Sequence, residues 1–169
     1  MGGLIDIAET ATAALLALQQ STESDHRWWA VRVLAAMDHT QTEWFVPALT
    51  DPAPDVRGAA ALALAAHPDG AAIAPLVSLL SDEDNVAAVM AVHALAKIGS
   101  EAVPQLVEAF EGAPRRGQIQ IVRALAELRD ARAIRLMLNA QAQGPAALQY
   151  WAQQGLERLG LNMVYLKPD

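Results

Sequence analysis

Apolar positions return along the chain in a pattern that predicts amphipathic helices. In residues 56–68, Val56, Ala60 and Leu64 recur at steps of four, and alanines fill the intervening positions of the same helical face. Four further segments align with this one on a single leucine: 26–38, 87–99, 117–129 and 148–160. Because the same stripe recurs, the sequence predicts five equivalent helices.

The aligned leucines lie 30 or 31 residues apart, a fixed period that is typical of helical solenoids. The leucines are Leu34, Leu64, Leu95, Leu125 and Leu156. A repeat of this length holds one helical hairpin, whose apolar face is buried only by its neighbours. We therefore expect one all-α domain, a right-handed α-solenoid of about five hairpins at 4–38, 40–68, 70–99, 101–129 and 131–160.

A shorter apolar segment precedes each aligned helix and predicts the first helix of each hairpin. These segments are 4–20, 42–50, 71–80, 101–110 and 131–140. Prolines recur near the start of three of them, where a helix tolerates the missing N–H. We expect residues 161–169 to lie across the last hairpin as an irregular cap.

Turn residues precede the aligned helices and suggest where those helices begin. We expect Asp55 and Asp84 to be N-caps and Pro145 to occupy the first helical position.

Two motifs resemble a known family. DVRGAAALAL (55–64) follows the pattern Asp-x-Arg-x-x-Ala-Ala-x-x-Leu, and EAVPQLVEAF (101–110) carries Ala-Val-Pro-x-Leu. They are similar to HEAT repeats, and most of all to the short, alanine-rich bacterial type called PBS-lyase HEAT-like repeats. The resemblance covers nearly the whole chain. It implies an α-solenoid, in a family that includes bilin lyase subunits, phycobilisome-degradation factors and chaperone-like adaptors.

The resemblance also predicts where ion pairs link the repeats. The family's arginine is present at Arg27 and Arg57, whereas Ala88, Gln118 and Gln149 stand at the later positions. We expect a ladder of Asp–Arg pairs that stops after the second repeat.

A second stripe on the aligned helices predicts a binding groove. In HEAT-like stacks these second helices usually form the concave side, and their surface is apolar here in four repeats of five. The expected groove residues are Trp28, Val31, Arg32, Leu62, Val89, Val92, His93, Ile119, Val122, Arg123 and Tyr150. The alternative is that tight curvature buries the stripe as ordinary packing. Trp29 and Trp151 align with a core position, and we expect them to be buried.

Charge and composition restrict the partners. The 169 residues carry a formal net charge of −7, which argues against nucleic acid as a partner. The chain has no cysteine, which excludes disulfides and thiolate sites and suits a reducing cytoplasm. No run of 18 apolar residues occurs, so we expect no membrane span.

Catalytic chemistry has no visible basis in the sequence. None of the four histidines belongs to an HExxH motif or precedes a glutamate, and no phosphate loop or nucleophile–base pair occurs. The acidic turn at Asp82, Glu83 and Asp84 lacks the spacing of an EF-hand, and we expect it to be structural. We expect no catalytic group, no metal and no cofactor.

Two hypotheses for function remain. The first is a non-enzymatic scaffold that binds a helix or extended segment of another protein in the groove, or pairs with a second copy. The second follows from the resemblance: a bilin lyase-like or chaperone subunit that holds a tetrapyrrole with Trp28, His93, Arg123 and Tyr150, in which the arginine binds a propionate.

Overall fold

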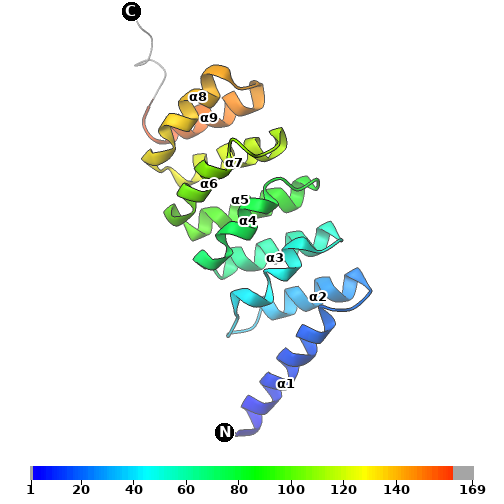
Figure 1. The fold of residues 1–169 in the computed structure, drawn as a ribbon. Helices are drawn as coiled ribbons and strands as arrows, with labels where there is room; N and C mark the ends of the chain where they lie inside the picture. Colours follow the sequence, from blue (N-terminus) through cyan, green and yellow to red (C-terminus); the bar gives the residue numbers. More distant parts are fainter. Residues whose placement is uncertain (1, 162–169) are drawn as a thin grey trace, which may run out of the picture.

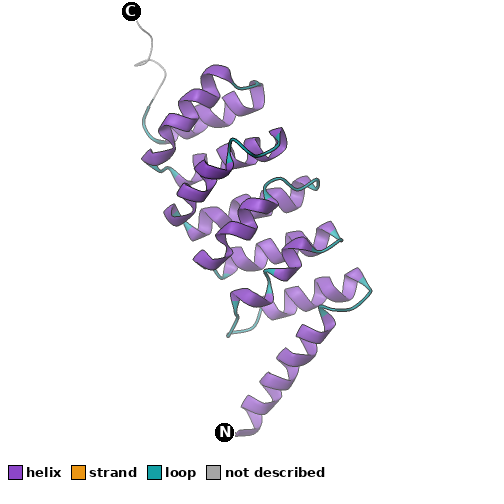
Figure 2. Ribbon diagram, in the orientation of Figure 1, coloured by secondary structure: helices purple, strands orange, loops and turns teal. Residues whose placement is uncertain are grey.

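The chain is an α-solenoid in which five helical hairpins stack into an elongated molecule with two layers (Figure 1). The computed structural model describes the backbone of residues 2–161 and the side chains of residues 9–161. Within these residues the structure consists of helices and turns, with no strand (Figure 2). We call the layer of first helices the A layer and the layer of second helices the B layer.

The B layer holds one regular α-helix from each hairpin. These helices are α2 (Ser24–Ala35), α3 (Pro54–Ala66), α5 (Asn85–Ile98), α7 (Arg115–Leu128) and α9 (Ala146–Arg158). Each packs against the next one along the stack. All five begin two residues before the segments that align on the leucines, because the preceding turn residues already belong to the first helical turn.

The predicted helix starts are partly correct. Asp84 is an N-cap, and its carboxylate accepts a hydrogen bond from the N–H of Ala87 at 2.8 Å. The expectation for Asp55 is wrong, because Ala53 is the cap of α3 and Pro54 takes the first helical position. Pro145 caps α9 and stands one residue outside the helix that it was expected to begin.

The A layer is less regular than the B layer. It contains α1 (Gly2–Leu18), α4 (Ile73–Leu79), α6 (Val103–Ala109) and α8 (Ile134–Gln143). The last three follow one-turn 3₁₀ helices, namely η3 (Gly70–Ala72), η4 (Ser100–Ala102) and η5 (Ala131–Ala133).

The second hairpin departs from the predicted helix at 42–50. Two 3₁₀ segments, η1 (Thr42–Trp44) and η2 (Pro47–Thr50), replace it. Pro47 has no N–H to bond the carbonyl of residue 43, so the α-helical hydrogen-bond pattern cannot run through this segment.

The aligned leucines form the centre of the core, as the repeat predicts. Four of them are 0 % exposed and Leu156 is 1 % exposed. Small alanines between the leucines let neighbouring helices approach closely, which accounts for the alanine content of the chain.

Arginine–aspartate pairs link the first repeats, as expected. Arg27 donates to both carboxylate oxygens of Asp51 at 2.7 and 2.8 Å, and Arg57 donates to Asp82 at the same two distances. The hydrogen bonds from Arg27 hold the pKa of Asp51 below its ordinary value, although burial opposes the shift.

The ladder ends after these two pairs. The arginine position in α5 is alanine, and in α7 and α9 it is glutamine, which reaches only its own hairpin. Gln118 donates to the carbonyl of Phe110 at 3.1 Å, and Gln149 donates to the carbonyl of Gly144 at 2.9 Å.

The predicted cap at 161–169 lies outside the described residues, apart from the half-buried Leu161.

Within the described part, no single helix is long and apolar enough to span a bilayer. One helix pair, Asn85–Ile98 with Ser100–Ala109, reaches those criteria only when both members are taken together, and it is bent by 112°.

Candidate interaction surface

The outward side of the B layer carries exposed apolar side chains in the second, third and fifth hairpins. We use the aligned leucine of each B helix as its anchor leucine. The outward surface, which we call the B face, comprises the positions nine, six and two residues before each anchor leucine and two residues after it. Its apolar members include Leu62, Val86 and Tyr150, which are 39 %, 62 % and 55 % exposed. Exposed apolar side chains that gather on one face are a feature of interaction sites.

The predicted groove corresponds to the B face only in part. Arg32, Leu62, His93 and Tyr150 are exposed on it. Trp28, Val89, Ile119 and Arg123 are half-buried on it.

Three predicted groove residues are wrong. Val31, Val92 and Val122 are 0–1 % exposed in the core. They stand three residues before the anchor leucine, on the flank of each helix that faces the following B helix. The predicted groove positions therefore point about 60° away from the exposed side of each helix, since successive residues are about 100° apart. Val86 and Lys97 are members of the B face that the prediction missed.

The prediction for Trp29 is also wrong. Its side chain is 58 % exposed, although Ala59 is buried and Met90 and Trp151 are half-buried at the equivalent positions. This position faces the preceding B helix, and no described helix of the B layer precedes α2. A sequence alignment of repeats cannot show this difference, because it treats the end repeats like the central ones.

Arg123 is held in place on the B face by an aromatic ring. Its guanidinium lies 4.9 Å from the ring centroid of Trp151 on the next helix. Its Nε is buried without a hydrogen-bond partner, and the carboxylate of Glu127 stands 3.9 Å from it. The cation–π contact orients the guanidinium, which suits it to binding a carboxylate group.

The B face is basic although the chain is acidic. Basic side chains on it are Arg32, Lys97, Arg116, Arg123 and Arg158. Acidic ones are Asp25, Asp55 and Glu127, so the face carries a formal charge of +2. Because the whole chain carries −7, the remaining surface is strongly acidic. This distribution favours an acidic partner on the B face.

His67 and the acidic turn serve the fold. The Nε2 of His67 lies 2.9 Å from the carbonyl oxygen of Ala35, at the junction of α3 with α2. In the acidic turn, Asp82 pairs with Arg57 and Asp84 caps α5, as expected for a structural role. Within the described part of the chain, no three His, Cys, Asp or Glu side chains are grouped as metal ligands.

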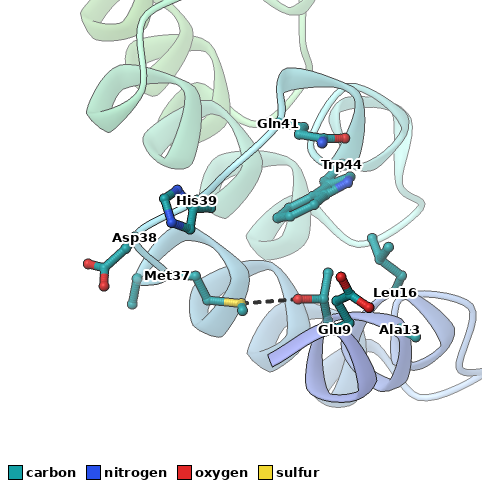
Figure 3. A pocket seen from close by; sticks show the side chains of 10 residues that line it. Glu9, Ala13, Leu16, Met37, Asp38, His39, Gln41 and Trp44 are labelled. Atoms are coloured by element: carbon teal, nitrogen blue, oxygen red, sulfur yellow. Dashed lines mark hydrogen bonds between the residues drawn. The ribbon is translucent and has the colours of Figure 1, made fainter. Parts of the chain in front are cut away.

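A separate cleft opens at the N-terminal end, on the A-layer side (Figure 3). It has a volume of about 980 Å³ and lies between α1, the end of α2 and η1. Leu16, Met37 and Trp44 form its apolar floor, while Glu9 and Asp38 lie at its rim. Gln19 fixes one wall by donating to the carbonyl of Trp44 at 3.1 Å. No pattern along the chain predicts this cleft, since it depends on the angle at which α1 leaves the stack.

The residues expected to hold a tetrapyrrole do not converge. Trp28 lies on α2 and Tyr150 on α9, at opposite ends of the B layer, with α3, α5 and α7 between them (Figure 1). Neighbouring helices stand about 8–10 Å apart, so these two residues are roughly 30–40 Å apart. One pigment molecule cannot contact both.

Comparisons with known proteins agree with the repeat architecture. Residues 42–117 match the family model described as HEAT repeats. A search of curated proteins finds no match. Among solved structures, the chain is similar to two engineered proteins of the Northeast Structural Genomics Consortium, each 24 % identical, with TM-scores of 0.52 and 0.51.

These similarities concern the fold. The alignments cover 91 % and 88 % of this chain, and 81 % and 47 % of the two engineered proteins, so the chain spans about half the length of the second. The chain is thus a helical-repeat solenoid whose middle hairpins are similar to HEAT repeats.

Proposed function

We propose that this protein is a non-enzymatic scaffold that binds a segment of another protein across the B face. The observation that carries the proposal is the exposure of Leu62, Val86 and Tyr150 on one side of the B layer. HEAT repeat scaffolds generally mediate protein interactions, and a solenoid offers an extended surface for them.

Charge supports an acidic segment as the partner. The B face carries the excess of basic groups, and the contact with Trp151 orients the guanidinium of Arg123. Apolar side chains of the partner would contact Tyr150 and Ile119 on either side of this arginine. Buried charge-assisted contacts next to aromatic residues are typical of interface hot spots. No observation favours the pigment-binding alternative.

The test uses variants that change the B face without disturbing the core. Leu62→Ser with Tyr150→Ser removes two exposed apolar side chains, so the Tm should stay within about 2 °C of the wild type. Ala74→Ser with Gln105→Ser is the control, because it places serine at two exposed positions of the A layer, on α4 and α6. The wild-type chain is first used to capture its partner, and each purified variant is then titrated with that partner.

The B-face variant should bind at least about tenfold more weakly, while the A-layer control should bind as the wild type does. Unchanged binding by a folded B-face variant would contradict the proposal. Loss of binding in the A-layer control would place the partner on the other layer.

A further inference from the structure

Among the described residues, the first B helix has no neighbour on the side that every later B helix buries. The positions eight, five and one residues before the anchor leucine face the preceding B helix. Two contacts establish this direction: Gln120 Nε2 donates to Asn85 Oδ1 on the preceding helix at 3.1 Å, and Trp151 lies under Arg123 of the preceding helix. In α3, α5, α7 and α9, every one of these positions is buried or half-buried.

In α2 the same three positions are His26, Trp29 and Val33, which we call the open flank. All three are exposed, Trp29 by 58 % and Val33 by 42 %. Helix α1 contacts α2 but leaves this flank uncovered. The open flank therefore presents an inter-repeat packing surface, with a tryptophan at its centre, to the outside.

The last B helix, α9, presents polar side chains at its end of the stack, whereas α2 presents apolar ones at the other end. On α9, the positions that would face a following helix include Gln153 and Glu157, which are exposed and hydrogen-bonded to each other at 2.8 Å. The equivalent positions on the earlier helices are valines and alanines. A polar outer face is what a terminal repeat needs to remain unpaired. The C-terminal end of the described stack has such a face and the N-terminal end does not.

We propose that two copies of this chain pair through their open flanks, with the two α2 helices antiparallel about a two-fold axis near Trp29. A head-to-tail contact would bury Trp29 against Gln153 and Glu157, and it would leave polar groups unpaired. A two-fold pairing buries apolar flank against apolar flank and closes after two copies.

Charge complementarity supports the antiparallel arrangement. Asp25 stands four residues before Trp29 and Arg32 stands three residues after it, and both side chains are exposed. Antiparallel pairing centred on Trp29 brings Asp25 of each copy beside Arg32 of the other copy. A parallel two-fold pairing would turn the two B faces in opposite directions and would separate these charges. Antiparallel helices also oppose their macrodipoles favourably.

The expected dimer is weak. Each copy contributes the flank of one 12-residue helix, which buries less than the roughly 1,200–2,000 Å² of a standard interface. We expect a dissociation constant on the order of micromolar or above.

Sedimentation equilibrium of the full chain over a range of concentrations tests the pairing. The wild type should associate reversibly to a dimer, and Trp29→Glu should weaken the association at least about tenfold. Tyr150→Glu is the matched control, because Tyr150 is an exposed aromatic residue at the other end of the B layer, and its dimer should be unchanged. A wild type that stays monomeric, or a Trp29→Glu variant that dimerises as well as the wild type, would overturn the proposal.

A charge swap tests the antiparallel geometry. Asp25→Lys and Arg32→Asp should each weaken the dimer by placing like charges together, and the double variant should restore it. If the double variant is as weak as the sum of the single changes, the helices do not pair in this orientation and the proposal fails. Dimer loss in Gln153→Arg, on the polar end, would instead indicate head-to-tail association and would also overturn it.

Discussion

Single residues in this solenoid divide into those that face a neighbouring repeat and those that face outward. The sequence identified the anchor leucines correctly, because every repeat buries that position. It failed at Val31, Val92 and Val122, since burial at those positions depends on the helix beside them and not on their own helix. It failed at Trp29 for the converse reason: burial was expected there, but no described B helix lies beside that position to bury it.

Among single substitutions, we expect the loss of the Leu95 side chain to lower the free energy of unfolding most. It is 0 % exposed, with two repeats on either side. Leu95→Ala should lower the free energy of unfolding by about 2–5 kcal/mol, because it removes apolar contacts and leaves a cavity. Val86→Ala, on the B face, should change it by less than about 0.5 kcal/mol. Urea unfolding of the two variants measures both values, and similar values would contradict the assigned register.

The pair of Arg27 and Asp51 should make stability depend on pH at the acid end. The folded pKa of Asp51 lies below its unfolded value of about 3.9, chiefly because Arg27 donates to the carboxylate. The resulting stabilisation is complete above the unfolded pKa and is lost as the pH falls through the folded pKa.

Arg27→Gln should therefore destabilise the protein at pH 7. The difference from the wild type should shrink as the pH falls below about 4. In a carboxyl NMR titration, the pKa of Asp51 should move up in the variant. A difference in stability that stays constant down to pH 2 would show that the ion pair does not carry the effect.

At the scale of elements, the B helices follow their sequence pattern closely and the A elements do so less well. Each B helix has a long apolar stripe and neighbours on most sides. The segment 42–50 is short and interrupted by Pro47, so local backbone chemistry decides its structure and yields η1 and η2. The cleft beside Trp44 arises from this departure and from the angle of α1, neither of which is encoded in the repeat.

Helix α3 carries a glycine that its packing does not require. A Cβ on Gly58 would stand 3.9 Å from the nearest atom, the Cα of Ala87, which is an ordinary contact. Gly58→Ala should therefore stabilise the protein by about 0.5–1 kcal/mol through helix propensity.

Gly155 in α9 provides the comparison. A Cβ there would stand 2.6 Å from the sulfur of the fully buried Met137. Overpacking of about 1–3 kcal/mol should outweigh the gain in propensity in Gly155→Ala. Thermal unfolding of both variants gives the comparison, and a stabilised Gly155→Ala would show that the packing around Met137 yields more easily than the structure indicates.

For the whole molecule, stability should fall from the centre of the stack toward α1. Among residues 9–18 of α1 none is fully buried, whereas α5 has six buried residues and neighbours on both sides. Native-state hydrogen exchange should therefore show low protection in α1 and the highest protection in α3 and α5. Uniform protection along the chain would contradict the nearest-neighbour account of the stack.

We propose above all that the partner binds to the B face, and site-specific photo-cross-linking tests this most directly. Benzoylphenylalanine is placed at Leu62 on the B face or at Ala74 on α4, two exposed positions on opposite layers, and each variant is mixed with the purified partner at equal concentration. The account predicts a cross-link from position 62 that the unmodified chain suppresses by competition, and none from position 74. A cross-link from position 74 with none from position 62 would contradict it.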